Sequence, residues 1–244
     1  MGGISRFVPA GSTVVIKPNA AWARTPEQAG NTNPEVVSSL VKLCLQAKAK
    51  RVIVLDRTLD HWKTALSMSG IGKAAETAGA EVVAAQDKIA YAPMDIPEGK
   101  KIRSELVARD VLNADVLINV PIAKHHGSTE VTLGLKNFMG PVWNRGTYHA
   151  LGLHQCIADL GTALRADLTI IDAYRVLLTN GPKGPGDVAE PRTIVVSTDP
   201  LASDVYACRF LKRNPQEVQH LVRASELGVG KFDLSGLKMK ELRV

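Results

Sequence analysis

The sequence of 244 residues is long enough to bury a substantial core, in one large domain or two small ones. Its 45% hydrophobic and 22% charged residues exclude a disordered or fibrous chain, and no apolar run approaches the ~20 residues that cross a bilayer. The net charge of +6 indicates a surface that attracts anions. Because the Lys and Arg residues are spread along the sequence and only 5% of the residues are aromatic, nucleic-acid binding is not favoured.

The patterns of apolar residues alternate between strand and helix along the chain. The clearest helix start is Asn33, a capping residue that is followed by a proline and an acid. In chain order the patterns predict strand 13–17, helix 33–44, strand 51–56, a helical region 62–78, strand 81–85, helix 104–113, strand 115–120, helix 149–164, strands 168–173 and 193–197, and helix 200–211.

This alternation predicts a layered α/β fold, with a mostly parallel sheet and helices on both faces. We find no repeat and no low-complexity linker, so we expect a single α/β domain over residues 1–244. The glycine- and proline-rich stretch 180–187 is expected to be a loop within that domain, because strand signals resume directly after it.

The three cysteines are far apart in the sequence and lie among apolar residues. Their spacing predicts buried free thiols in a reducing compartment, with no iron–sulfur cluster within the chain. The first residues show no secretory leader, so we expect a cytoplasmic protein that does not associate with a membrane, while an export leader upstream of this chain stays open.

The segment 119–140 concentrates polar chemistry where the apolar strand 115–120 ends at Pro121. It carries two lysines, two histidines, several hydroxyls and the carboxamide of Asn137. Ligands of open α/β sheets bind at the carboxyl ends of the strands, so this segment is the first candidate for a site.

Other strand ends also carry polar groups, namely Lys17 with Asn19, Asp56 and Asp172. The carboxyl ends of parallel strands share one edge, so we expect these groups to converge with residues 124–129 on one cleft. We also expect an anion to bind near Lys124, Lys136 and the first main-chain N–H groups of the following helix.

One hypothesis is an enzyme that performs acid/base chemistry on a small anionic molecule. Its catalytic candidates are His125, Asp56 and Asp172, and its ligand-binding candidates are Lys17, Asn19, Lys124, Thr129, Lys136 and Asn137.

The alternative is a metal centre built from one of the two adjacent histidines, His125 or His126, together with His149, His154 or a strand-end aspartate. The flanking lysines repel a cation, which favours acid/base use of His125 over metal binding. His220, in an amphipathic C-terminal helix, is expected to be solvated.

The same residues resemble the domain of unknown function 362 family, over nearly the whole chain. The resemblance rests on Lys17–Asn19, Asn31–Glu35, Asp56–Thr58, Asn119–His126, Thr132–Gly140, Asp172–Arg175 and Thr198–Pro200.

Members of that family are α/β domains that occur alone or joined to ferredoxin-type iron–sulfur segments, some with export leaders. Compared with its longer members, this chain has no cysteine cluster, and we expect it to correspond to the family domain without the strand and helix that come first in those members. The resemblance therefore implies a second hypothesis, a non-catalytic module that binds a redox partner protein in an electron-transfer or maturation system. It implies no particular reaction and no particular cofactor.

Overall fold

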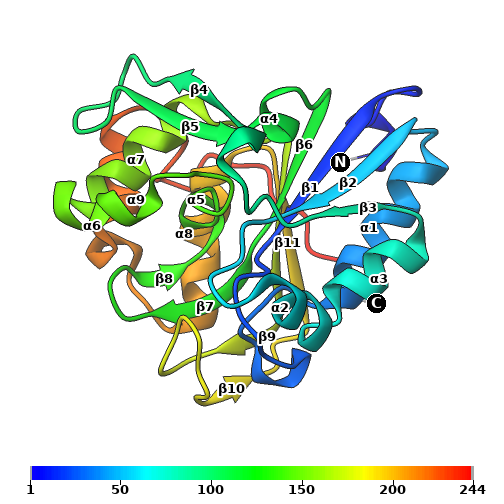
Figure 1. Ribbon diagram of the computed structural model, residues 1–244. Coiled ribbons are helices and arrows are strands. Elements are labelled where there is room, and N and C mark those ends of the chain that lie inside the picture. Colours follow the sequence, from blue (N-terminus) through cyan, green and yellow to red (C-terminus); the bar gives the residue numbers. More distant parts are fainter. Residues whose placement is uncertain (1, 243–244) are drawn as a thin grey trace.

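A nine-stranded mixed sheet forms the centre of the computed structural model, which describes residues 2–242 (Figure 1). The main path of the sheet has the order β3-β2-β1-β6-β9-β7-β8, and β10 and β11 also pair with β9. The strands are β1 (Thr13–Pro18), β2 (Arg51–Leu55), β3 (Glu81–Val83), β6 (Val116–Val120), β7 (Ile122–His126), β8 (Glu130–Thr132), β9 (Leu168–Leu177), β10 (Val188–Ala189) and β11 (Thr193–Ser197).

Strands β3, β2, β1, β6 and β9 run parallel, and so do β9 and β7. Strands β8, β10 and β11 pair in the antiparallel direction, as hairpin or edge strands. The predicted layered α/β fold with a mostly parallel sheet is confirmed.

Helices cover both faces of the sheet, as alternate side chains of the strands require (Figure 1). Val14 and Ile16 of β1 pack with α1 and α3, whereas Val15 belongs to the core that contains α5, α7, α8 and α9. The helices are α1 (Pro34–Gln46), α2 (Trp62–Met68), α3 (Ile71–Ala78), α4 (Arg109–Leu112), α5 (Gly134–Asn137), α6 (Tyr148–Leu151), α7 (Leu153–Ala163), α8 (Pro200–Ala207) and α9 (Gln219–Glu226).

The prediction of a helix over 104–113 is wrong. Residues Ser104–Ala108 form β5, which pairs with β4 (Tyr91–Asp95) in a separate two-stranded antiparallel sheet, and only α4 is helical. Pairing across the hairpin decides the structure, because it buries Val107 and Tyr91 in the core. Local helical preference is weak compared with such tertiary contacts.

Glycines divide two of the predicted helices. Gly70 lies between α2 and α3 with a φ of 72°, and Gly152 lies between α6 and α7 with a φ of 109°. Glycine enters this left-handed region without a steric penalty, so each position changes the direction of the chain. The predicted cap is confirmed, since the Asn33 side chain accepts a hydrogen bond from the Glu35 N–H.

Pro121 interrupts a strand that then resumes. Strand β6 ends at Val120, and β7 begins at Ile122 and continues along β9, with an irregular register after Ile122. Lys124 is therefore held on a strand rather than on a loop.

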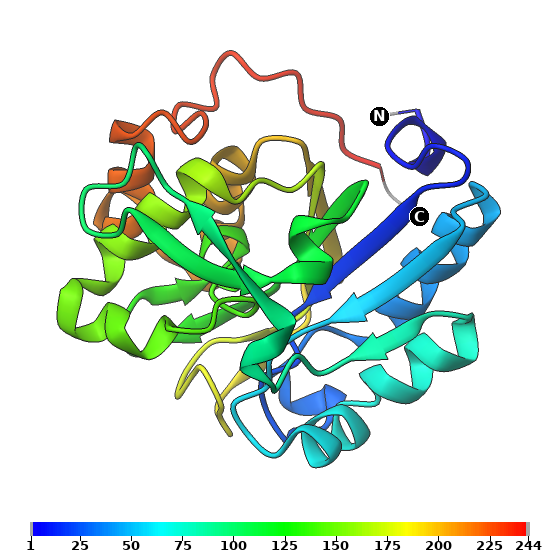
Figure 2. The same ribbon diagram turned by 45° about the horizontal axis from the view of Figure 1, so that its top comes forward.

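The C-terminal stretch leaves α9 and crosses the molecule toward the side that holds the first strand (Figure 2). Within residues 2–242, no helix combines the length and the apolar character needed to cross a membrane.

His220 contradicts the expectation of a solvated side chain. It is 0% exposed on α9, and its ring stacks on that of His154 of α7 at 5.8 Å between centroids. Neither His220 nitrogen has a hydrogen-bond partner in the described part of the chain. Burial, with smaller contributions from His154 and Lys136, lowers the pKa of His220 to about 3. The ring is thus a neutral part of the core.

Candidate functional site

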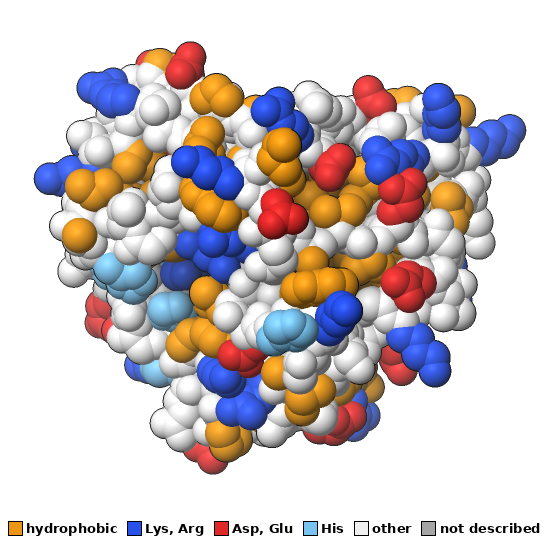
Figure 3. Space-filling view, viewed as in Figure 1, with side chains coloured by type: hydrophobic (Ala, Val, Ile, Leu, Met, Phe, Trp, Pro, Cys, Tyr) orange, Lys and Arg blue, Asp and Glu red, His pale blue; other side chains and the backbone are white. Residues whose placement is uncertain are grey.

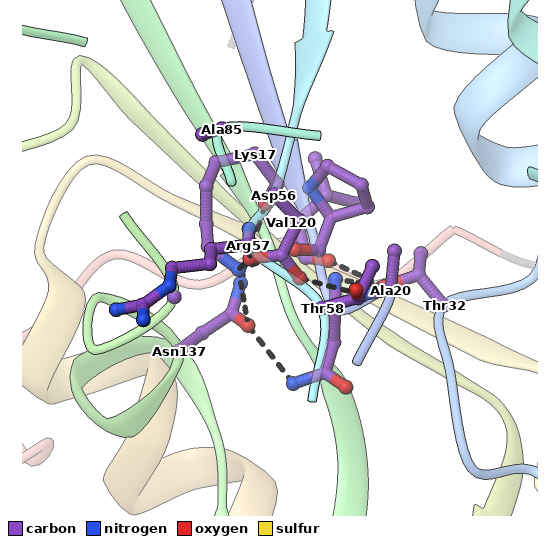
Figure 4. Close-up of polar contacts among 12 residues, drawn as sticks. Lys17, Ala20, Thr32, Asp56, Arg57, Thr58, Ala85, Val120 and Asn137 are labelled. Carbon is purple, nitrogen blue, oxygen red and sulfur yellow. Dashed lines mark hydrogen bonds and ion pairs between the residues drawn. The ribbon is translucent and has the colours of Figure 1, made fainter. Parts of the chain in front are cut away.

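Lys17 brings a positive charge into the interior at the carboxyl end of β1. Its side chain is 0% exposed, and the ammonium group lies 2.9 Å from Asp56 Oδ1 and donates to Asn137 Oδ1 at 3.0 Å. It also donates to the carbonyl of Pro18. These three acceptors match the three N–H groups of an ammonium (Figure 4). Burial lowers the pKa of Lys17, and the Asp56 charge acts in the opposite direction.

Asp56 follows β2 and neutralises Lys17. Its Oδ2 accepts the Ala20 N–H at 2.7 Å, and its Oδ1 accepts the Arg57 N–H at 2.9 Å. The carboxylate therefore joins the ends of the two neighbouring strands β1 and β2. Lys17 is the cation that forms an ion pair with Asp56, and the Asp56 charge also acts at longer range on Arg145 and Lys124.

Asn137, the last residue of α5, connects the strand ends to one another. Its Oδ1 accepts from Lys17 and, at 3.0 Å, from Asn19 Nδ2. Its Nδ2 donates to Asn119 Oδ1 at 2.8 Å and to the Lys17 carbonyl at 3.2 Å. The position of each of these side chains thus depends on Asn137 (Figure 4).

Lys124 of β7 joins the same group of side chains through Asn19. Its ammonium donates to Asn19 Oδ1 at 3.0 Å and to the Gly30 carbonyl at 2.6 Å, and the residue is 1% exposed. Burial lowers the pKa of Lys124 well below its usual value, and the charge of Lys136 adds to that effect. We call the connected residues the lysine–asparagine network: Lys17, Asn19, Asp56, Asn119, Lys124 and Asn137.

Further cations lie against this network. Arg145 donates to the carbonyls of Arg57 and Thr58 at 2.9 and 3.1 Å. Arg57 donates to the Trp143 carbonyl at 2.5 Å and lies 4.2 Å from the centroid of that ring. Lys17, Arg57, Lys124, Lys136 and Arg145 form what we call the cationic cluster.

Lys136 differs from the other members of the cationic cluster. Its ammonium makes no hydrogen bond or ion pair with any residue that the structure describes, and the side chain is half-buried. Burial lowers the pKa of Lys136 to about 8, with smaller contributions from the charges of Arg145 and Lys17. Its protonation therefore changes close to neutral pH.

The face of the molecule in Figure 3 is hollowed where Lys and Arg side chains gather, and histidines border that hollow. Within the lysine–asparagine network and the cationic cluster together, Asp56 is the sole carboxylate. A low-dielectric recess with a net positive charge attracts anions strongly.

The start of α5 does not offer the expected anion site. Asp204 of α8 is fully buried, and its two oxygens accept the N–H groups of Gly134 and Leu135 at 2.7 and 2.9 Å. The prediction that a ligand binds the first N–H groups of this helix is therefore wrong, because a side chain of the protein occupies them. Burial raises the pKa of Asp204 to about 7, against the effect of these two hydrogen bonds.

The two adjacent histidines project to opposite sides of β7, as neighbours on a strand do. His125 Nδ1 accepts the Gly181 N–H at 3.0 Å, and the ring makes no hydrogen bond to the lysine–asparagine network within residues 2–242. His126, on the side of Lys124, accepts the Ser128 N–H at 3.1 Å. Burial lowers the pKa of His126 to about 2, so its ring is neutral at physiological pH.

Two other predicted site residues hold loops in place. The Asp172 carboxylate accepts the N–H groups of Asn33 and Tyr174 at 2.7 and 2.9 Å. Thr129 donates to the Val131 carbonyl at 3.2 Å, within the β7–β8 turn. Neither residue makes a hydrogen bond to the lysine–asparagine network within residues 2–242. The structure thus brings together Lys17, Asn19, Asp56, Lys124 and Asn137, with Lys136 beside them.

Sequence reasoning assigned no role to Asn119, Arg57 and Gly140, although they lie in the quoted motifs, and it gave none to Arg145 either. A lone asparagine in the apolar run of β6 was the available signal for Asn119, whereas nothing local distinguishes Arg145. At Gly140 a Cβ atom would lie 2.3 Å from Asp56 Oδ1 and 2.4 Å from Lys17 Nζ. Only glycine lets the chain pass so close to this ion pair.

No group of three or more His, Cys, Asp or Glu side chains is placed to hold a metal ion in residues 2–242. Cys44, Cys156 and Cys208 are free and buried, as predicted.

Comparisons with known proteins agree with the sequence motifs. The family described as domain of unknown function 362 (DUF362) matches residues 14–209. A thylakoid-associated protein of Synechocystis sp. is 25% identical over 237 residues, which cover 94% of this chain and 72% of the relative.

Proposed function

This chain belongs to the DUF362 family, and we propose that it binds a small anionic molecule at the carboxyl ends of its parallel strands. The excess of positive charge in the cationic cluster carries this proposal. Buried charges are costly unless they are paired, and here Asp56 pairs with Lys17 alone among the cations. A carboxylate or phosphate of a ligand would supply the missing negative charge.

Lys136 is the residue that contacts the anion in this proposal. Its ammonium has no partner among the described residues, in contrast to Lys17 and Lys124, whose ammonium groups have fixed acceptors. The lysine–asparagine network holds the surrounding backbone, while Lys136 and Arg145 supply charge for the ligand. Asn19 and Asn137 fix the positions of both buried lysines.

Acid/base chemistry on the bound anion is the catalytic part of the proposal. Lys136 replaces His125 as the acid/base group, because the pKa of Lys136 is about 8 and its amine is unengaged. The ring of His125 faces Gly181 instead.

Sulfate is the best probe for binding, since it does not titrate near neutral pH. Calorimetry at low ionic strength should show sulfate binding at pH 7 that weakens by about tenfold toward pH 9, as Lys136 loses its proton. Lys136→Arg should bind sulfate equally at both pH values. Lys73→Arg, at an exposed position on α3, should behave as the wild type does.

A wild-type protein that binds no sulfate would disprove the proposal. Loss of binding in Lys136→Ala alone, with Lys73→Ala unchanged, would assign the contact to Lys136.

The second candidate function is a partner-binding module of an electron-transfer or maturation system. Ile194 and Val196 favour it, because they are 42% and 44% exposed on the same face of strand β11, which pairs with β9. Exposed apolar residues on such a strand suit contact with another protein. The thylakoid association in the name of the relative is compatible with this role. Loss of partner binding in Ile194→Lys, with sulfate binding intact, would support it.

A further inference from the structure

Lys136 has the features of a reactive amine. The lysines beside it are held by fixed acceptors, which leaves their nitrogen atoms engaged: Lys17 by Asp56 and Asn137, and Lys124 by Asn19 and the Gly30 carbonyl. Lys136 makes no such contact with the described residues. Its nitrogen is therefore available to a bound molecule.

The surroundings of Lys136 have two effects. They favour the neutral form of its amine, and they attract anions. Burial and the charges of Arg145 and Lys17 disfavour the ammonium, as the lowered pKa of about 8 reflects. The same charges raise the local concentration of an anionic molecule. Desolvated lysines beside other cations are the usual nucleophiles toward carbonyl groups.

We propose that the anion bound by this protein carries an aldehyde or ketone group, and that Lys136 condenses with it to form an imine. This inference rests on the anion binding proposed above. The substrate class is a 2-oxo acid or a phosphorylated carbonyl compound, whose negative charge is held by the cationic cluster.

The chemical step balances without an oxidant or a reductant. The lone pair of the neutral Lys136 amine forms a bond to the carbonyl carbon, and the carbonyl π electrons move to oxygen. A proton passes from nitrogen to that oxygen and gives a carbinolamine. Protonation of the hydroxyl group and loss of one water molecule then leave the C=N bond. The resulting iminium is an electron sink for chemistry at the adjacent carbon.

Reductive trapping tests the proposal directly. The whole protein is incubated with pyruvate, dihydroxyacetone phosphate or uncharged acetone in the presence of sodium cyanoborohydride, which reduces iminium groups. Intact mass and peptide mapping should show one adduct per chain, on Lys136, with an anionic carbonyl compound and none with acetone. The preferred probe identifies a carboxylate or a phosphate as the anion.

The variants separate this inference from anion binding itself. Lys136→Arg keeps the charge and lacks the amine, so it should bind sulfate and form no adduct. Lys73→Arg should form the adduct as the wild type does.

Sulfate binding without an adduct in the wild type would overturn the imine and leave anion binding standing. Absence of both would overturn both proposals. Adducts spread over surface lysines, or persisting in Lys136→Arg, would also overturn the assignment.

Discussion

The Lys17 ammonium lies 2.9 Å from Asp56 Oδ1, and the two side chains are 0% and 3% exposed. This buried ion pair joins the carboxyl ends of β1 and β2, and Asn137 connects it to α5. Breaking one member of a buried pair is more harmful than replacing both, because the remaining charge loses its partner.

Asp56→Asn should therefore lower the free energy of unfolding by about 3–5 kcal/mol, since it leaves Lys17 buried beside a neutral group. Urea unfolding measures the change. The double variant Lys17→Met/Asp56→Asn should recover part of the loss. Wild-type stability in Asp56→Asn would contradict the prediction and would mean that Lys17 is neutral in the fold.

Gly140→Ala should disrupt the same ion pair by a steric route. The added Cβ would lie 2.3 Å from Asp56 Oδ1 and 2.4 Å from Lys17 Nζ, so the side chains must move. We expect the free energy of unfolding to fall by about 3 kcal/mol, the upper end of the usual cost of overpacking a core. Thermal or urea unfolding measures the change. Gly146→Ala is the matched control in the same connection, because no atom lies within 4 Å of the Cβ position there. Equal stability of the two variants would argue against this account.

Asp204→Ala should leave the N–H groups of Gly134 and Leu135 buried without an acceptor. The expected cost is about 3 kcal/mol, from two unsatisfied donors. Asp233→Ala is the control, since Asp233 is exposed and bonds only to Ser235 in the described part of the chain. A similar unfolding midpoint in both variants would show that Asp204 does not hold α5.

His220 should make the protein sensitive to mild acid. Its pKa is about 3 in the fold and 6.5 in the unfolded chain, so the unfolded chain binds the proton more tightly. Stability is full above pH 6.5 and falls by about 1.4 kcal/mol per pH unit below it, down to about pH 3.

Unfolding at pH 7.5 and 5.5 tests this prediction. Between pH 7.5 and pH 5.5, His220→Leu should lose about 1.4 kcal/mol less of its free energy of unfolding than the wild type loses. His61→Leu, at an exposed position, should lose as much as the wild type. An identical pH dependence in all three proteins would refute the role of His220.

The sequence predicts much of the sheet and the edge at which the candidate site lies, because both follow from general rules of strand pattern and sheet topology. Apolar runs define β1, β2, β6 and β9, and parallel strands place their carboxyl ends together. Lys17, Asn19 and Asp56 were therefore found without knowledge of their contacts. The roles suggested for them stay proposals.

The remaining features depend on contacts between distant segments. Asp204 reaches Gly134 across 70 residues, and this hydrogen bond removes an anion site that local reasoning predicts. β5 pairs with β4 where the local pattern indicates a helix. Likewise, the burial of His220 depends on α7, which its own helix pattern does not reveal.

The hydrogen bond between Lys17 and Asn137 spans 120 residues, and that of Lys124 with Asn19 spans 105. Contacts of such large sequence separation form slowly, because a long loop must close first. As the chain emerges during synthesis, Lys17 has no amide partner until α5 has been made. We therefore expect the network to close late in folding, with the N-terminal strands loosely held until α5 docks.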